Sequence, residues 1–424
     1  MIPLFEHQEK IIKENKLWAG LFTGTGSMKT RTSLELAEGR ILIICEKQGR
    51  DDRTFESNAV KFNIKKDFKV ISKEDFRRDW ESLPQYDTVI IDEAHNFFGV
   101  SPDTRQEDYI QIPKTSQLFD GLKNYLRNKR PKRFYMLTAT PAVKPMHVYA
   151  LAVLFGKEWN YFDFREKYYF QKKVAAHKFV WIAKNNDLLK DRLAEIVNKF
   201  GYTGGLSDFM DVPEQTYLTK YFKLTDEQKN SIKELRRSNA DPMAVRSYIR
   251  TIENGVLYGN EIVKVSEKRD KLVGSKKTFS SEKIDYIIER ASEFKKMLIF
   301  ASYTAQVEAI AEALKKEGYD YVKAITGQTD RSEVFKMADR SDKSILVVQS
   351  SISAGYELPS FPVVIYASYS NRVLHKIQGD GRVLRGNALK KNLYLSLVVK
   401  GGLDEQCYNT VSSGVDFNEK IMTN

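Results

Sequence analysis

The chain of 424 residues contains little cysteine and no long hydrophobic run. Its two cysteines, Cys45 and Cys407, stand far apart, so the sequence offers neither a disulfide framework nor the ligand spacing of a zinc site. No apolar stretch approaches the ~20 residues that span a bilayer, and the N-terminus has no basic segment followed by an apolar core. We therefore expect a soluble, cytoplasmic protein of a reducing compartment, without a membrane partner.

Acidic residues are outnumbered by basic ones. Lysine and arginine total 68 against 56 for aspartate and glutamate, which gives a formal net charge of +12. An excess of this sign favours an anionic partner such as nucleic acid, although the same charge also serves as a solvated surface. The length exceeds that of one ordinary core and predicts two or three domains.

Short apolar segments alternate with helical patterns along the chain, which predicts βαβ units and an α/β fold with two parallel sheets. The predicted strands are residues 41–44, 89–91 and 134–137 in the first half and 297–300, 345–348, 363–366 and 393–397 in the second. Between the halves, the sequence becomes helical and highly charged. The expected domains are therefore 1–210, a linker with a helical insertion at 211–275, and 276–424.

Two adjacent carboxylates, Asp92 and Glu93, directly follow the predicted strand 89–91. A buried parallel strand delivers such groups to the carboxyl edge of its sheet, where open α/β folds bind ligands. One carboxylate can hold Mg²⁺ while its neighbour activates a water, which suits a magnesium–nucleotide site. Alternatively, the pair only begins a helix, where negative charge favours the positive end of the dipole.

A candidate phosphate-binding loop (P-loop) occupies residues 23–30, Thr-Gly-Thr-Gly-Ser-Met-Lys-Thr. In such a loop, small residues let backbone N–H groups close on phosphate oxygens, while Lys29 reaches the phosphates and Thr30 reaches Mg²⁺. The match is imperfect, because Met28 stands where the usual pattern has glycine before the lysine, and Thr23 replaces the first glycine. The segment also fits a plain strand-to-helix connection.

Two further segments place polar groups after apolar strands. Thr138 and Thr140 follow a predicted strand and precede a proline, which taken alone indicates a turn. In residues 378–385, Arg382 and Arg385 are three positions apart and share a face if the segment is helical. Two guanidinium groups on one face can clamp a phosphoryl group, whereas the plain alternative is a surface salt-bridge pair.

In this order, the four segments resemble the motifs of superfamily 2 helicases and translocases. Residues 92–95, Asp-Glu-Ala-His, match the DEAH form of motif II, and residues 378–385 match motif VI. The chain looks most similar to compact Swi/Snf-like DNA helicases of phages and bacteria, and the resemblance runs over nearly all of its length. It implies two RecA-like domains in tandem, with ATP and Mg²⁺ as cofactors.

The resemblance also implies roles for the residues at matching positions. The implied catalytic residues are Glu93 as general base, Lys29 on the phosphates, Arg382 and Arg385 as arginine fingers, and Gln378. The implied nucleotide-binding residues are Gln8, Thr25, Gly26, Ser27, Lys29, Thr30 and Gly355, and the implied metal ligands are Thr30 and Asp92. Coupling is implied for His95, Thr138 and Thr140, and nucleic-acid contact for Ser302, Tyr303 and Ser350.

These roles together imply an ATP-dependent nucleic-acid motor that hydrolyses ATP to ADP and phosphate between two RecA-like domains. The resemblance favours DNA, whether single-stranded, duplex or branched, over RNA, and leaves both strand separation and duplex translocation open. Replication, recombination or restriction partners are compatible with it, as is the host cytoplasm if a phage encodes the protein. Two other functions stay open: a nucleic-acid- or partner-binding module with a decayed ATPase, which Met28 favours, and a motor subunit of a restriction or recombination complex.

Overall fold

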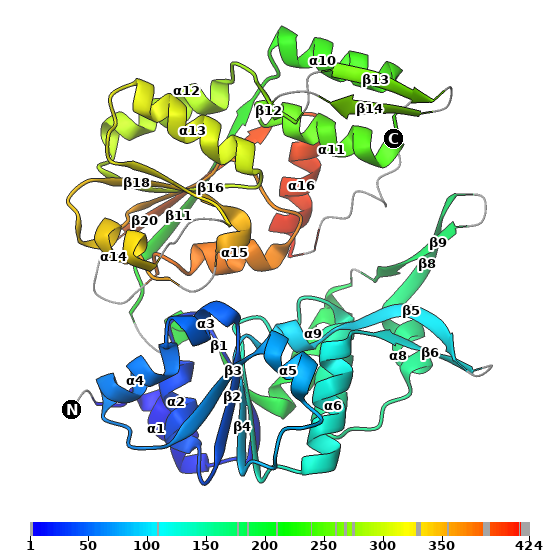
Figure 1. Ribbon diagram of the computed structural model, residues 1–424, viewed down its shortest axis with the longest axis vertical. Coiled ribbons are helices and arrows are strands. Elements are labelled where there is room, and N and C mark those ends of the chain that lie inside the picture. The colour runs from blue at the N-terminus through cyan, green and yellow to red at the C-terminus, as the bar shows by residue number, and fades with distance from the viewer. Residues whose placement is uncertain are drawn as a thin grey trace. The chain divides into compact units, whose positions relative to one another are not determined.

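The computed structural model divides into two compact units, Met1–Met210 and Asp211–Asn424 (Figure 1). It describes residues 3–107, 110–175, 178–184, 186–208, 211–238, 240–258, 261–266, 269–273, 276–327, 332–353, 356–384, 391–414 and 416. Each unit contains a six-stranded sheet with helices packed beside it.

The sheet of the first unit is parallel throughout. Its strands, in spatial order, are β10 (Gly201–Gly204), β1 (Trp18–Thr23), β7 (Arg133–Leu137), β4 (Thr88–Ile91), β2 (Ile41–Cys45) and β3 (Phe68–Ser72). Every residue of β2, β4 and β7 is buried. Continuous apolar runs form these strands because helices cover both faces of a central parallel strand.

Side chains of β2 alternate between two hydrophobic clusters: Ile43 packs in one and Ile44 in the other. The helices of this unit are α1 (Glu6–Glu14), α2 (Lys29–Leu36), α3 (Lys47–Asp51), α4 (Thr54–Phe62), α5 (Lys73–Asp79), η1 (Ala94–Phe97), α6 (Gln117–Lys129), α7 (Pro145–Leu154), α8 (Tyr161–Tyr168), α9 (Asp187–Phe200) and η2 (Leu206–Asp208). Two antiparallel hairpins complete it: β5 (Val100–Glu107) with β6 (Ile110–Thr115), and β8 (Tyr169–Ala175) with β9 (Lys178–Ala183).

The sheet of the second unit is also parallel throughout. Its strands, in spatial order, are β11 (Glu214–Phe222), β20 (Lys391–Val399), β19 (Val363–Tyr366), β16 (Lys296–Ala301), β18 (Ser344–Gln349) and β17 (Val322–Ile325). The helices are α10 (Asp226–Arg237), α11 (Pro242–Glu253), α12 (Glu282–Glu293), α13 (Thr304–Lys316), α14 (Ser332–Arg340), η3 (Ser350–Ile352), α15 (Val373–Asp380) and α16 (Leu403–Ser412). Two small antiparallel pairs join β12 (Val256–Leu257) to β15 (Lys277–Thr278) and β13 (Glu261–Ser266) to β14 (Arg269–Val273).

These two parallel sheets confirm the predicted α/β fold with two tandem sheet domains. The segment 211–275, expected to be a linker with a helical insertion, contains α10 and α11 but also β11, an outer strand of the second sheet. Most side chains of β11 are exposed, so its sequence lacks the apolar run that marks the central strands. The second sheet therefore begins earlier in the chain than the sequence pattern indicates.

A buried ion pair lies where α11, α12 and α16 meet. The side chains of Lys283 and Asp404 are 3% and 2% exposed, and Lys283 Nζ lies 2.7 Å from Asp404 Oδ2. Lys283 also donates to Asn254 Oδ1 (2.9 Å), and Asn254 Nδ2 donates to Asp404 Oδ1 (3.1 Å). Because each charge meets an opposite charge and hydrogen-bond partners, burial of the pair is tolerated.

Glu253 caps the first turn of α16 inside the same cluster. Its carboxylate accepts from the backbone N–H of Leu403 (3.1 Å) and of Asp404 (2.7 Å). Burial, reinforced by the charge of Asp404 and opposed by that of Lys283, raises the pKa of Glu253 to about 7. Its protonated form is therefore favoured in the folded chain relative to the unfolded one.

We expect this shift to make the free energy of unfolding fall as the pH rises from about 4.5 to about 7. Within that window the folded chain binds the proton of Glu253 and the unfolded chain has released it. The contribution is about 3 kcal/mol. Urea unfolding at pH 5 and pH 7.5 measures it, and the Glu253→Gln variant should lose this share of the pH dependence. An identical pH dependence in both proteins would contradict the prediction.

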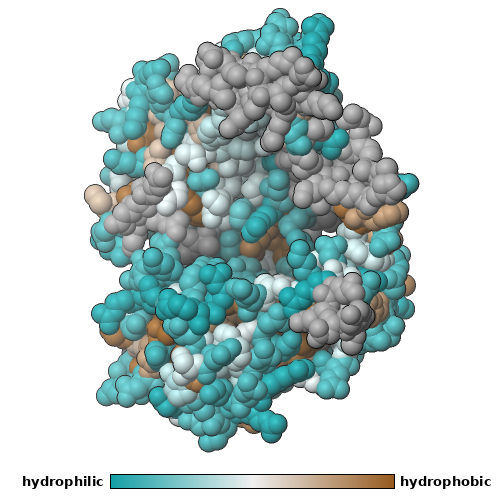
Figure 2. Space-filling view, turned by 45° about the vertical axis from the view of Figure 1, so that its right-hand side comes forward, coloured by the Kyte–Doolittle hydropathy of each residue, from teal (hydrophilic) through white to brown (hydrophobic). Residues whose placement is uncertain are grey.

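The surface is predominantly hydrophilic on the face drawn in Figure 2, with hydrophobic residues in scattered patches. Within the described ranges, no helix combines the length and the apolar character needed to cross a membrane.

Candidate functional site

The motifs of the first half converge at the carboxyl edge of the first sheet. Register pairs Leu21 of β1 with Leu137 of β7, and Met136 of β7 with Ile91 of β4. Since parallel strands end at the same edge, the segments that follow β1, β4 and β7 meet there. The sheet thus brings the predicted phosphate loop, acidic pair and threonine motif into one region of one unit.

The phosphate loop is a compact turn between β1 and α2. Ser27 Oγ donates to the Gly24 carbonyl (2.8 Å), and the Gly24 N–H donates to the Gly204 carbonyl of β10 (2.9 Å). A Cβ on Gly24 would approach the Leu206 backbone nitrogen to 2.9 Å, so only glycine fits there. Gly26 adopts a φ of +87°, which a side chain disfavours. These two glycines explain why the loop is glycine-rich.

Lys29 begins α2 and turns its ammonium back over the loop. Its Nζ donates to the carbonyls of Thr23 (2.8 Å) and Gly24 (2.9 Å). Thr30 follows in the first turn of α2, where it is half-buried. A helix N-terminus with a lysine and a hydroxyl has the chemistry that anionic phosphates require. The structure therefore places both predicted side chains beside the loop.

Met28 occupies the left-handed region of backbone conformation, with φ 57° and ψ 38°. For a residue with a side chain this conformation costs roughly 1–2 kcal/mol, because Cβ crowds the following carbonyl oxygen. Glycine bears no such cost. The backbone geometry thus explains why glycine is usual before the lysine of such a loop, and it shows that this chain adopts the same path with methionine.

We expect Met28→Gly to leave the fold intact and to change its stability by no more than about 1 kcal/mol, because relief of backbone strain and added freedom of the unfolded chain oppose each other. Met28→Val should destabilise the protein by more than that, since a β-branched side chain disfavours positive φ. Urea unfolding of the three proteins compares them directly. If Met28→Val and the parent protein are equally stable, the prediction that the backbone is strained at position 28 is wrong.

The acidic pair ends β4. The Asp92 N–H donates to the Ile44 carbonyl of β2 (2.8 Å). Burial and the charge of Glu93 raise the pKa of Asp92 to about 7, against the opposing charge of Lys29. A carboxyl group in this state lacks sufficient positive charge around it, and a divalent cation would supply that charge. Oxygen ligands from Asp92 and Thr30 are of the type that Mg²⁺ prefers.

The residues predicted to act in coupling form one chain of contacts. His95 Nδ1 lies 3.3 Å from Glu93 Oε2 and 3.1 Å from Thr138 Oγ1. Thr138 Oγ1 in turn accepts from the Thr140 N–H (3.0 Å). The His95 side chain is only 9% exposed, so its position is fixed by these partners. The structure thus connects the acidic pair to the threonine motif through His95.

Gln8 lies behind the phosphate loop and is fully buried. Its Oε1 accepts from the Phe5 N–H (3.1 Å) and its Nε2 donates to Thr32 Oγ1 (2.9 Å). Thr32 Oγ1 donates onward to the Met28 carbonyl (3.2 Å). Gln8 therefore ties α1 to α2 and to the loop, and adenine recognition by its amide stays a prediction.

Two residues that the sequence analysis did not identify, His7 and Glu46, also make contacts at this edge. His7 Nε2 lies 3.1 Å from the Ser27 carbonyl of the phosphate loop. Glu46, which follows β2, accepts from Asn96 Nδ2 (2.8 Å) and forms an ion pair with Lys73. The only sequence signal for His7 is its position next to Gln8, and Glu46 was recognisable only as the polar residue after a predicted strand.

In the second unit, the segment that resembles motif VI, residues 378–385, is hydrogen-bonded to Ser353 and Tyr356. Arg382 is 6% exposed; its Nε donates to the Gln378 carbonyl (2.8 Å) and its Nη1 to the Tyr356 carbonyl (2.6 Å). Gln378 Oε1 accepts from Ser353 Oγ (3.2 Å). These two hydrogen bonds give Arg382 a structural role at the end of α15. Its role as an arginine finger stays a prediction. Gly355 and Arg385 lie outside the described residues.

The three candidate nucleic-acid contacts follow neighbouring strands. Ala301 of β16 pairs with Gln349 of β18, so Ser302 and Ser350 both lie at the carboxyl edge of the second sheet. The Ser302 N–H donates to Ser368 Oγ (2.8 Å), and Tyr303 is half-buried ahead of α13. Ser350 is 5% exposed. The structure therefore leaves Ser302 and Tyr303 partly accessible and places Ser350 inside.

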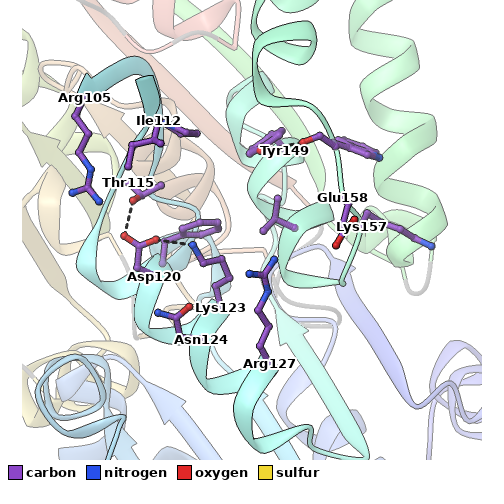
Figure 3. Close-up of a pocket in the computed structure, with 14 residues that line it drawn as sticks. Arg105, Ile112, Thr115, Asp120, Lys123, Asn124, Arg127, Tyr149, Lys157 and Glu158 are labelled. Carbon is purple, nitrogen blue, oxygen red and sulfur yellow. Dashed lines mark hydrogen bonds and ion pairs between the residues drawn. The ribbon is translucent and has the colours of Figure 1, made fainter. Parts of the chain in front are cut away.

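A cavity of about 680 Å³ lies elsewhere in the first unit, between hairpin β5–β6, α6 and the turn after α7 (Figure 3). Arg105 approaches it from β5 and Arg127 from α6. At its wall, Asp120 accepts from Thr115 Oγ1 (2.5 Å) and pairs with Lys123 (3.1 Å). None of the predicted site residues lines this cavity, which is therefore separate from the strand-end site.

Comparison with solved structures gives matches over nearly the whole chain. Two structures to which the chain is similar are the SWI2/SNF2 ATPase core of Sulfolobus solfataricus in complex with dsDNA and the Hef helicase domain of Pyrococcus furiosus. The first is 16% identical, covers 97% of this chain and 91% of that chain, and has a TM-score of 0.39. The second is 13% identical, covers 96% of this chain and 97% of that chain, and has a TM-score of 0.49.

No curated protein matches the sequence. The model of the helicase conserved C-terminal domain matches residues 280–387. That range begins before α12 and includes β16, β18, β19 and α15. The matched range lies within the second unit.

Proposed function

We propose that the protein is an ATP-dependent nucleic-acid motor of superfamily 2, a DNA helicase or duplex DNA translocase. The observation that carries this proposal is the arrangement of the first unit, where the predicted phosphate loop follows β1 and Asp92 follows β4 at the same edge of one sheet. A lysine beside a phosphate loop and an acidic pair at one sheet edge are the components of a nucleoside-triphosphate site. The helicase C-terminal domain at 280–387 supports the nucleic-acid part.

Each of five site residues of the first unit has one role in the proposed reaction. Lys29 and the N–H groups of the loop bind the phosphates, while Thr30 and Asp92 would hold Mg²⁺. When bound, the metal neutralises charge that develops during phosphoryl transfer. Glu93 accepts the proton of the attacking water, and His95 maintains the orientation of Glu93 through their 3.3 Å contact.

Three further roles involve residues of the second unit. Arg382, Arg385 and Gln378 would contribute to hydrolysis, as the family resemblance implies. A cationic side chain near a transferring phosphoryl group stabilises its transition state. The proposal therefore requires the whole chain, and neither unit alone is expected to turn over ATP.

DNA is the proposed partner, bound mainly through its phosphates. The formal charge of +12 favours a polyanion, and phosphate contacts make binding sequence-tolerant and salt-sensitive. ATP hydrolysis by the full chain, measured in parallel with single-stranded DNA, duplex DNA, branched DNA and RNA, tests the proposal. Stimulation by duplex alone indicates a translocase, and stimulation by RNA alone overturns the choice of DNA.

A binding module with a decayed ATPase is the second candidate, and the left-handed methionine at position 28 is the observation that favours it. The two functions differ in turnover. Absence of DNA-stimulated hydrolysis in the parent protein, with hydrolysis in the Met28→Gly variant, would favour the second candidate and overturn the first.

A further inference from the structure

Hairpin β8–β9 of the first unit has an unusual composition. Residues 169–184 contain four lysines, one histidine, four aromatic residues and no carboxylate. The other hairpin of the same unit, residues 100–115, contains three carboxylates, two basic residues and one tyrosine. Basic residues interleaved with aromatic residues are therefore found in hairpin β8–β9 and not in hairpin β5–β6.

The base of the hairpin is anchored, while its outer rings are exposed. Tyr169 is 5% exposed, and its hydroxyl accepts from the Met146 N–H (3.3 Å). The guanidinium of Arg165 lies 4.1 Å from the ring centroid of Trp181. Phe170 and Phe179, in contrast, are 45% and 55% exposed. Figure 1 shows the two strands projecting from the helices of the first unit.

The strand register places an exposed ring beside a lysine. Lys173 pairs directly with Phe179, and Gln171 pairs with Trp181. Directly paired residues of an antiparallel pair share one face with side chains about 5 Å apart. Lys173 and Phe179 are both exposed, so a cation and a ring face are available together on this face.

We propose that hairpin β8–β9 binds single-stranded nucleic acid, with an unpaired base stacked on Phe179 and a phosphate at Lys173. Aromatic rings stack on any base and lysines follow the backbone, which gives sequence-tolerant binding. A single strand is favoured over a duplex because the bases of a duplex already stack on one another. The absence of carboxylates excludes the repulsion that a polyanion meets at the other hairpin. The choice of nucleic acid as partner rests on the proposed function.

The test uses the full chain without nucleotide and measures anisotropy of a fluorescein-labelled 15-residue oligothymidylate and of a 15-base-pair duplex. We expect Phe179→Ala to weaken binding of the single strand about tenfold, the effect of one lost stacked base. Lys173→Ala should weaken it as well and reduce the slope of log K against log salt by about 0.7, the share of one phosphate. Duplex binding should change less in both variants.

Phe179→Tyr and Lys114→Ala are the controls. The first keeps the ring and should bind the single strand like the parent. The second removes the same charge as Lys173→Ala from an exposed position of hairpin β5–β6 and should have the smaller effect. Thermal melting checks that all variants are folded, which is expected because both altered side chains of β8–β9 are exposed.

Four outcomes decide whether the hairpin binds a single strand, independently of the proposed motor function. Equal affinity of the parent, Phe179→Ala and Lys173→Ala for the single strand overturns the inference, as does failure of the parent to bind it. Equal losses in duplex and single-strand binding also overturn the preference for unpaired bases. If the parent hydrolyses no ATP yet its oligothymidylate affinity falls in Phe179→Ala, the motor function fails and the hairpin site stands.

Discussion

Replacement of Glu93 by glutamine is expected to lower the rate of ATP hydrolysis by at least about 100-fold while nucleotide binding is retained. The amide has nearly the same shape but cannot accept the proton of the attacking water. Asp92, Lys29 and the phosphate loop are unchanged, so the groups that hold the nucleotide stay in place. Phosphate release measures the rate, and the fluorescence of a labelled ATP analogue measures binding.

Glu46→Gln is the matched control, because Glu46 also lies at the carboxyl edge of the first sheet and also acts electrostatically on Asp92. It removes the same charge without removing the proposed base. A small change in rate is expected. Unchanged hydrolysis in Glu93→Gln, or equal losses in both variants, would remove Glu93 from the role of general base.

Replacement of Asp404 by alanine is expected to destabilise the second unit by about 3–5 kcal/mol. The side chain of Lys283 is 3% exposed and would lose the carboxylate of Asp404, which lies 2.7 Å away. The Val399 N–H, 2.9 Å from Asp404 Oδ2, would lose its acceptor as well. Urea unfolding followed by circular dichroism measures the loss.

The double variant Lys283→Met with Asp404→Leu removes both charges and should be more stable than Asp404→Ala, because no charge remains buried alone. Asp226→Ala breaks the exposed pair of Asp226 with Lys229 and should change stability far less, because solvent screens an exposed ion pair. A loss below about 1 kcal/mol in Asp404→Ala would contradict the account of the buried cluster.

Seven of the eight central strands of the two sheets were predicted, whereas β1, in which Gly20 interrupts the apolar run, and the outer strands were not. All seven predicted strands exist, and they are β2, β4, β7, β16, β18, β19 and β20. The four outer strands, β3, β10, β11 and β17, were not predicted. An outer strand keeps some side chains in solvent, as the exposed Lys323 in the middle of β17 shows, and its sequence therefore lacks a continuous apolar run.

The site was predictable where chemistry follows a strand directly. Asp92 and Thr138 directly follow buried strands, and Lys29 begins the helix after the loop that follows β1, so topology alone brings them to one edge. The inward position of Arg382 was not predictable, because its partner is the Tyr356 carbonyl, 26 residues earlier in the chain. Contacts of this kind depend on the path of loops, for which periodicity gives no signal.

The hydrogen bonds of Lys29 bear on selectivity among anions. Its ammonium is already solvated by two carbonyls of its own loop, at 2.8 and 2.9 Å. An arriving anion must therefore replace these bonds, and it gains only the difference between the old contacts and the new ones. A singly bound ion such as sulfate gains little from that exchange, whereas a triphosphate that contacts the loop, the helix and the lysine at once gains much more. If the loop binds a nucleotide as we propose, it selects its ligand by the number of simultaneous contacts and not by charge alone.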